Sequence, residues 1–440
     1  MVTNSVRRDR PRILVLADDC NPYWHSLPAL VYSALSALSK YVDLVVVTQI
    51  RNRPNIDQTG LGSAEVVYID TEIIAGPLHR LASFLSRDEN KGMTLKVALN
   101  YPSYLAFEWA AWRRFRRELM DGAFDVVHRF SPMSPTIPSP IASWSPVPFV
   151  IGPILGGLPW PNDFKAEMNR EGEWMNYFRA IHRWLPFYQS TYYKAAAILA
   201  AYDHTISDIP LACKAKTINF SEGGVDPSKF IMPVRQKRNC MTILFVGRLV
   251  PFKMAEVLVL SFAGSPILRK HKLIIVGDGP ERRRLETIIA DNSLSGSVNL
   301  TGTVSHDRVG ELMRESEIFA FPSVREQGGG VLTLAMMSGM ACVVVDYGGP
   351  AVRVKHGCGI KIPMGDLNHL IRSYTNELEA LVDDYDRVIR MGINGRQYTE
   401  TFYSWDAKAK KTVEVYDWVL GRREEKPNFW DHPFTPVHAT

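Results

Sequence analysis

The chain has 440 residues, more than one hydrophobic core usually serves, so the sequence predicts two domains. Its 46% hydrophobic and 22% charged residues are typical of globular proteins, and a net charge of +5 is too mild to indicate a nucleic-acid partner. The five cysteines are scattered, with no pair at metal-ligand spacing. These features predict reduced thiols, no bound metal, no cofactor and no nucleic acid.

The sequence shows neither a signal peptide nor a transmembrane segment, and the predicted compartment follows from this. The apolar run at 13–17, behind a basic N-terminus, is too short for a signal peptide, and no window holds about 18 uninterrupted apolar residues. We therefore expect a cytoplasmic protein, with peripheral contact at the inner membrane face as an open addition.

The first half of the chain begins with a pattern typical of a βαβ unit. Its predicted strand, helix and second strand occupy 13–17, 28–39 and 42–48. The loop at 18–26 joins the first strand to the helix and carries Asn21, Tyr23, Trp24 and His25. A strand at 65–69 and a helical stretch from 78 to 119, interrupted at Tyr101–Pro102, are predicted next.

Two helical stretches combine aromatic and basic residues. One carries Trp109, Trp112 and the basic run 113–119, and the other covers 165–190. Trp and Arg on an amphipathic helix can face a membrane surface or an anionic acceptor. The alternative is a solvated helix face above a buried aromatic stripe, and both interpretations stay open.

Two strand-to-loop segments of the first half hold further candidates. His128 is predicted at the carboxyl end of a strand that begins at 124. The segment 148–161 is predicted as a buried strand and a loop with Gly156 and Gly157, and it lacks the Lys-Ser/Thr of a Walker loop. These glycines either bring the backbone close to a ligand or form tight turns.

The second half is predicted to bind an anion where its first strand ends. A strand at 242–246 precedes Arg248 and Lys253, which are close enough in sequence to reach one anion at the strand-to-helix turn. Arginine supplies a planar fork for phosphate oxygens and lysine a mobile point charge. Later strands, at 272–276 and 298–300, are predicted to end near Gly277 and Val304.

The stretch 318–349 has the pattern strand, glycine-rich loop, helix, strand. The strands are predicted at 318–322 and 341–345, and the helix at 331–338. A loop between the carboxyl end of a strand and the amino end of a helix is where open α/β sheets bind ligands. Gly328, Gly329 and Gly330 let the backbone approach a ligand, and free helix N–H groups favour an anion. Glu326 is predicted to accept hydrogen bonds from hydroxyls there.

This stretch resembles the nucleotide-sugar site of retaining glycosyltransferases of family 4, which have the GT-B fold. The pattern of that family is Glu, seven residues, a second Glu, Ala-Met, two mostly small residues and Gly. Glu326 matches the first Glu, while Ala335–Met336 and Gly339 match the end. The position of the second Glu is occupied by Leu334, which departs from the pattern.

The resemblance implies an α/β chain of GT-B architecture, with two Rossmann-like parallel-sheet domains facing a central cleft. It is strong over 242–363 and weaker over 12–230. An acceptor-side domain is expected at 1–230 and a nucleotide-sugar donor domain at 240–402. A C-terminal helix at 403–423 is expected to return to the first domain, before a tail at 424–440.

The resemblance also implies roles in sugar transfer from a nucleoside-diphosphate donor with retention at the anomeric carbon. Glu326, Arg248 and Lys253 would act at the donor without a metal, and His128 would point toward the reacting sugar carbon. Further donor contacts would come from Gly277, Val304, Gly328, Gly329, Gly330, Val331, Leu332 and Leu334. A carbohydrate or lipid-linked acceptor would face Asn21, Tyr23, Trp24, His25, Gly156 and Gly157.

Leu334 leaves three interpretations open. In the family the second Glu accepts hydrogen bonds from the ribose, and losing such a bond costs about 1.5–3 kcal/mol, about ten- to hundredfold in affinity. The three interpretations are an active transferase with weaker or altered nucleotide contacts, a transferase that uses another donor, and a non-catalytic nucleotide-sugar-binding partner or scaffold. Independently of Leu334, a GT-B-like sugar-nucleotide epimerase is a further alternative.

Overall fold

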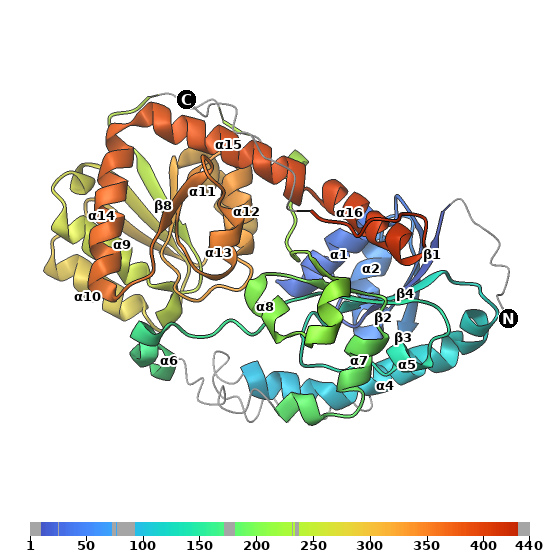
Figure 1. Ribbon diagram of the computed structural model, residues 1–440. Coiled ribbons are helices and arrows are strands. Elements are labelled where there is room, and N and C mark those ends of the chain that lie inside the picture. Colours follow the sequence, from blue (N-terminus) through green and yellow to red (C-terminus); the bar gives the residue numbers. More distant parts are fainter. Residues whose placement is uncertain are drawn as a thin grey trace. The chain divides into compact units, whose positions relative to one another are not determined.

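The computed structural model describes residues 10–429, except for 25, 73–75, 77–92, 171–180, 231 and 234–236. Its contacts divide the chain into two compact units, each built on one parallel sheet (Figure 1). Within the described residues, unit 1 comprises 10–157, 181–222 and 405–429, and unit 2 comprises 158–170 and 223–404.

Unit 1 contains a seven-stranded sheet in the order β3-β2-β1-β4-β5-β6-β7, with every neighbouring pair parallel. Its strands are β1 (Arg12–Ala17), β2 (Asp43–Gln49), β3 (Glu65–Ile69), β4 (Val126–Ser131), β5 (Phe149–Ile154), β6 (Ala197–Ala200) and β7 (Thr217–Asn219). Its α-helices include α1 (Leu27–Leu38), α2 (Arg53–Thr59), α4 (Met93–Met120), α5 (Ile141–Trp144), α7 (Tyr188–Lys194), α8 (Asp203–Asp208) and α16 (Trp405–Val419). Short 3-10 helices are η1 (Ile50–Asn52), η4 (Ile181–Trp184) and η5 (Leu211–Lys216).

Both faces of this sheet are covered. Ile13 and Val15 of β1 enter a core shared with α1 and α16, whereas Leu14 and Leu16 enter a core shared with α4, α5 and α7. Successive side chains of a strand point to opposite faces, so a strand buried on both sides needs apolar residues at every position. This requirement explains the continuous apolar runs in the sequence.

Unit 2 contains a six-stranded parallel sheet in the order β10-β9-β8-β11-β12-β13. Its strands are β8 (Thr242–Val246), β9 (Lys272–Val276), β10 (Val298–Gly302), β11 (Ile318–Phe321), β12 (Ala341–Val345) and β13 (Gly359–Ile362). Its α-helices include α6 (Lys165–Arg170), α9 (Ala255–Gly264), α10 (Arg282–Asp291), α11 (His306–Glu315), α12 (Gly330–Met337), α13 (Gly348–Arg353), α14 (Leu367–Asp383) and α15 (Tyr385–Tyr403). Its 3-10 helices are η2 (Asn162–Phe164), η6 (Pro227–Lys229), η7 (Pro251–Lys253) and η8 (Leu268–Lys270).

The secondary structure agrees with most of the predicted elements. The strands predicted at 65–69 and 341–345 are confirmed with the same bounds, and the helix predicted at 331–338 is α12. α4 runs unbroken through Pro102, so the predicted interruption there is wrong. No helix of the described residues combines the length and apolar character that crossing a bilayer requires.

The borders of the units differ from those predicted. Unit 1 ends its second segment at Glu222 rather than at 230, and residues 158–170 belong to unit 2. The helix predicted at 403–423 is α16, which packs against α1 within unit 1. Of the predicted tail, residues 424–429 are described without a helix, and 430–440 lie outside the described residues.

Candidate functional site

The candidate site of unit 2 lies at the carboxyl ends of its central strands. β8 and β11 are neighbours, and the sheet continues through β9 on one side and β12 on the other. The strand order therefore reverses between β8 and β11, which is where open α/β sheets bind ligands. η7 follows β8 and the loop 322–329 follows β11, so both meet at this edge.

η7 and the loop 322–329 are joined by main-chain and side-chain contacts. The carbonyl of Phe252 accepts hydrogen bonds from the N–H of Val324 at 3.0 Å and the hydroxyl of Ser323 at 3.2 Å. Lys253 forms a salt bridge with Glu326, and their side chains are only 12% and 18% exposed. Two predicted catalytic residues, 73 positions apart in the chain, are thus in direct contact.

α12 begins beside this ion pair. Gly329 has a φ of 66°, a left-handed conformation that favours glycine, and its N–H donates to the Glu326 carboxylate at 3.3 Å. Around Gly330, the first helical residue, no atom lies within 4 Å of the place a Cβ would occupy. No side chain caps this end of the helix. The space beside Gly330 is therefore open at the start of α12, next to the Lys253–Glu326 pair, and a helix amino end is suited to an anion.

The remaining α12 residues of the predicted site divide between core and surface. Leu332 is buried, whereas Val331 and Leu334 are partly exposed. Leu334 therefore presents hydrocarbon where the family pattern has a carboxylate.

Arg248, Gly277 and Val304 occupy loops at the same end of the sheet. Arg248 is exposed after β8, and Val304 is partly exposed between β10 and α11. Gly277 has a φ of 133°, and a Cβ there would lie 1.9 Å from the carbonyl oxygen of Gly247. Its absent side chain therefore lets the turns after β8 and β9 pack closely, next to Arg248.

Arg353, at the end of α13, supports the glycine loop and was missed by sequence analysis. Its side chain is buried, and Nε donates to the carbonyl of Gly328 while Nη1 donates to the hydroxyl of Thr333 at 2.7 Å. The guanidinium also lies 5.0 Å from the ring centroid of Tyr403. Arg353 thus connects the loop to the first turns of α12. No local pattern marks it, because its partners lie 20 and more positions earlier in the chain.

Residues 158–170 border the site from a distant part of the sequence, and sequence analysis assigned them to the other domain. The ring of Trp160 packs edge-on against Phe252 at 6.3 Å, and the guanidinium of Arg325 lies 5.1 Å from the same indole. Arg325 also donates to the carbonyl of Leu158 at 3.2 Å. Trp160 therefore contacts the residues immediately before Lys253 and Glu326.

The predicted acceptor side lies on the first loop of unit 1. Asn21 is buried, and its carboxamide oxygen accepts from the N–H of Tyr23 at 3.1 Å and the side chain of Asn55 at 2.9 Å. Tyr23 and Trp24 are exposed, and His25 lies outside the described residues. Asn21 therefore shapes the loop, and Tyr23 and Trp24 are its accessible aromatic side chains.

A charged cluster beside this loop was also missed, although Asp18 and Asp19 directly follow a predicted strand. Arg51 lies 3.3 Å from Asp18, 3.0 Å from Asp19 and 3.4 Å from Glu72. Burial, reinforced by the carboxylate of Asp19, raises the pKa of Asp18 to about 6. A carboxyl group with that pKa can exchange a proton near neutral pH.

The position predicted for His128 is wrong. His128 lies inside β4, fully buried, and not at its carboxyl end. Its Nε2 donates to the carbonyl of Gly152 at 2.6 Å, which leaves Nδ1 to accept from the hydroxyl of Tyr416 at 2.6 Å. Burial lowers the pKa of His128 to about 4. A neutral imidazole with both nitrogens bonded has a structural role and no contact left for a sugar.

Gly156 and Gly157 follow β5 in a turn that is hydrogen-bonded to α8. The hydroxyl of Thr205 donates to the carbonyl of Gly156 at 2.8 Å and accepts from its N–H at 3.2 Å. A Cβ on Gly157 would lie 2.4 Å from a carboxylate oxygen of Asp208. Of the two interpretations of these glycines, the geometry favours the tight turn.

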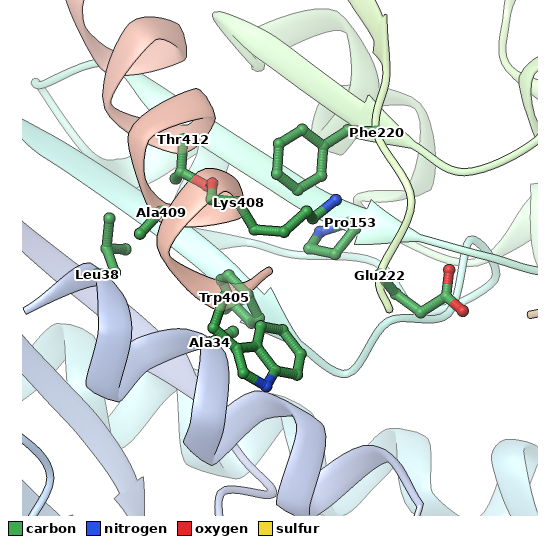
Figure 2. Close-up of a pocket in the computed structure, with 10 residues that line it drawn as sticks. Ala34, Leu38, Pro153, Phe220, Glu222, Trp405, Lys408, Ala409 and Thr412 are labelled. Atoms are coloured by element: carbon green, nitrogen blue, oxygen red, sulfur yellow. The ribbon is translucent and has the colours of Figure 1, made fainter. Parts of the chain in front are cut away.

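A small pocket of unit 1 lies where α16 packs against α1 and the end of β7 (Figure 2). Its volume is about 10 Å³, which is at the lower limit for one water molecule. Lys408 fills one wall, with its ammonium 3.6 Å from the ring centroid of Phe220 and donating to the carbonyl of Ser221. This pocket is too small for a sugar, and its contacts hold α16 on the sheet.

No group of three or more His, Cys, Asp or Glu side chains in the described part of the chain could hold a metal ion. The cysteines at 20, 213, 240, 342 and 358 are free thiols.

Comparison with known proteins shows what the segment that holds the site of unit 2 is similar to. Residues 230–398 match the model of glycosyl transferases group 1. The chain is 30% identical over 223 residues to the phosphatidylinositol N-acetylglucosaminyltransferase gpi3 subunit of Schizosaccharomyces pombe, covering 48% of this chain and 43% of that protein. It is 30% identical over 193 residues to the D-inositol 3-phosphate glycosyltransferase of Gordonia bronchialis, covering 41% and 40%. The chain thus aligns with less than half the length of these relatives.

The fold extends the similarity beyond these alignments. Sucrose-phosphate synthase from Thermosynechococcus elongatus superposes with a TM-score of 0.62 at 16% identity, covering 94% of this chain and 100% of that one. A match over both units confirms the predicted GT-B fold class. The segment 230–398, which matches the model of glycosyl transferases group 1, contains Arg248, Lys253, Glu326 and the glycine loop of this site.

Proposed function

We propose that this chain is a retaining glycosyltransferase that moves a sugar from a nucleoside-diphosphate sugar to a carbohydrate or lipid-linked acceptor. The observation that carries the proposal is the Lys253–Glu326 ion pair beside the uncapped start of α12. A cation, a helix amino end and a hydroxyl-binding carboxylate converge there at the switch point of a parallel sheet.

The chemistry proposed for this site is the breaking of the bond between the anomeric carbon and the departing phosphate oxygen. Negative charge develops on the diphosphate, and Lys253, Arg248 and the first N–H groups of α12 would stabilise it without a metal. The acceptor hydroxyl forms the new bond to the anomeric carbon, and its proton passes to the departing phosphate oxygen. Glu326 would hold hydroxyls of the donor sugar.

The Lys253–Glu326 contact also suggests how the two charged side chains stabilise each other before a donor binds. A buried carboxylate needs a partner, because desolvation penalises an unpaired charge. Lys253 supplies that partner before a donor binds. When the donor binds, Lys253 would turn toward the diphosphate, and hydroxyls of the donor sugar would then bind Glu326 in its place.

The experiment that tests this function measures binding and turnover separately. Calorimetry with a panel of nucleoside diphosphates and nucleotide sugars is performed on the wild type, Leu334→Glu and Lys253→Met. We expect the wild type to select one donor, Lys253→Met to bind it at least tenfold more weakly, and donor hydrolysis or transfer to fall about a hundredfold or more in Lys253→Met and Glu326→Gln.

Leu334 favours one second candidate, a non-catalytic nucleotide-sugar-binding partner or scaffold. If nucleotide binding appears only in Leu334→Glu, or if the wild type binds a donor but neither hydrolyses nor transfers it with any acceptor, the scaffold is correct. Release of nucleotide and an epimerised sugar without an acceptor would instead identify an epimerase.

A further inference from the structure

The exposed side of α4 carries a stripe of two basic side chains with an apolar side chain at each end. Trp109, Arg113, Arg116 and Met120 are spaced by four, three and four residues, which places them along one line of the helix. All are exposed, Trp109 by 51%. The opposite side of the helix enters the core of unit 1 through Phe107, Ala111, Phe115 and Leu119.

The stripe continues onto the neighbouring helices of the same layer. Trp112 of α4 packs against Trp144 of α5 at 6.1 Å, and Trp144 packs against Phe187 at 5.9 Å. Phe187 is itself exposed, and Trp184 of η4 is 89% exposed. In Figure 1, α4, α5 and α7 lie together on one side of the sheet of unit 1. We call Trp109, Arg113, Arg116, Met120, Trp184 and Phe187 the basic–aromatic face.

The charge on this face is unbalanced. Arg113, Arg116 and Arg117 form no salt bridge within the described residues, and Arg113 lies 4.7 Å from the ring centroid of Trp109. The two carboxylates of α4 do not neutralise these arginines. Glu108 is buried and hydrogen-bonded to Tyr104 and Ser139, and Glu118 forms a salt bridge with Arg114. A ligand for this face must therefore bury the exposed indole rings and carry negative charge.

We propose that the basic–aromatic face binds the surface of an anionic phospholipid bilayer. Indole rings are amphipathic and favour the headgroup region, while arginines reach lipid phosphates from the same depth. The stripe occupies residues 109–120 of α4, so about 18 Å of helix can lie along the membrane plane. A helix with apolar side chains and arginines on its exposed side is typical of interfacial binding. Since none of the described helices could cross a bilayer, this contact is peripheral.

The observations favour a bilayer over two other occupants. A nucleic acid needs a longer track of cations than three arginines with an exposed apolar side chain at each end. If a second copy of this chain docked through the same face, the arginines of the two copies would repel each other, and affinity would fall unless carboxylates lay opposite them. A lipid surface supplies both phosphate groups for the arginines and, just beneath them, the apolar acyl region for the aromatic side chains.

The test is sedimentation of the full-length protein with vesicles of phosphatidylcholine alone or with added phosphatidylglycerol. We expect binding to the anionic vesicles only, weakening as salt is added. The test variant is Arg116→Ala with Trp184→Ala. Its matched control is Arg283→Ala with Ile267→Ala in unit 2, which also removes one arginine and one exposed apolar side chain.

The two variants give distinct expected results. Loss of one arginine near a lipid surface weakens binding about fivefold, and loss of the indole adds to it, so the test variant should bind at least tenfold more weakly than the wild type. The control should bind as the wild type does, and the single variant Trp184→Phe, which keeps Arg116 and an aromatic ring, should retain most of the wild-type affinity. Equal binding by test and control variants overturns the proposal, as does equal binding of the wild type to both vesicle types.

Self-association is checked in the same samples without lipid. A wild-type dimer that Arg116→Ala with Trp184→Ala dissociates would assign the face to a second copy of the chain and overturn the proposal. Thermal melting of each variant shows that unit 1 remains folded, and nucleotide binding shows that the site of unit 2 is intact.

Discussion

Arg353 donates a hydrogen bond from Nη1 to the hydroxyl of Thr333 at 2.7 Å, and both side chains are buried in unit 2. Because the same guanidinium also binds the carbonyl of Gly328, it positions the glycine loop relative to the start of α12. Two contacts from one planar fork cannot be reproduced by an ammonium group.

Arg353→Lys should therefore weaken nucleotide binding about tenfold, since a hydrogen bond to a charged group contributes about 1.5–3 kcal/mol. Calorimetry with the preferred nucleotide measures the change. Arg396→Lys is the matched control, because Arg396 binds the carbonyls of Met337 and Phe230 at the other end of α12. Both variants should lower the thermal midpoint, but only Arg353→Lys should change nucleotide affinity, and equal losses would show that Arg353 merely stabilises the unit.

Gly329 and Gly330 are expected to respond differently to the same substitution. Gly329→Ala places a side chain on a φ of 66° and should destabilise the free protein by about 1–2 kcal/mol. Gly330→Ala meets no atom within 4 Å and should leave the thermal midpoint unchanged or slightly raised.

The added methyl group of Gly330→Ala should nevertheless weaken nucleotide binding, because it occupies the space that a ligand at the start of α12 would use. Calorimetry and thermal melting of both variants provide the measurement. Unchanged affinity in Gly330→Ala would mean that the ligand does not approach this turn.

Trp160→Ala should weaken nucleotide binding about fivefold, although Trp160 belongs to the part of the sequence first assigned to the acceptor domain. The indole packs on Phe252 and Arg325, and such aromatic and cation–π contacts contribute about 1 kcal/mol. Trp109→Ala, an exposed tryptophan of unit 1, is the control and should bind nucleotide normally. An effect of equal size in both variants would refute a specific role for residues 158–170.

His128 should make the stability of unit 1 depend on pH. Burial lowers its pKa from 6.5 to about 4, so the unfolded chain takes up the proton first. The contribution of neutral His128 is therefore complete above pH 6.5 and is lost as the pH falls toward 4, by up to about 3 kcal/mol. Urea unfolding of the wild type and His128→Gln should show a stability difference that shrinks from about pH 7 to about pH 5.

Asp18 should show the opposite trend, which gives an internal comparison. Its raised pKa of about 6 means that the folded chain holds the proton more tightly than the unfolded chain. The cost of ionising it is complete above pH 6 and disappears as the pH falls toward 4. Relative to Asp18→Asn, the wild type should therefore gain stability over that range, and a loss there would mean that the pairing with Arg51 outweighs burial.

The sequence predicted the sheets and the strand, loop and helix of the unit 2 site because both depend on short segments. A parallel strand buried on both faces must be apolar along its length, which made 13–17 and 341–345 recognisable without any partner. The glycine-rich loop between a strand and a helix, with Glu326 before it, likewise lies within a few consecutive residues. Lys253, by contrast, reaches that loop only because β8 lies beside β11 in the sheet, although β9 and β10 separate these strands in the sequence.

Tertiary structure decided the roles that depend on distant partners. His128 is structural because its second ring nitrogen is hydrogen-bonded to the hydroxyl of Tyr416, 288 positions later in the chain. Helix α16 brings that hydroxyl to β4. Arg353 positions the glycine loop, and Trp160 borders the site, through contacts that no spacing rule connects. Burial, which removes water and forces each polar group to find a partner, is set by the whole fold and not by neighbours in sequence.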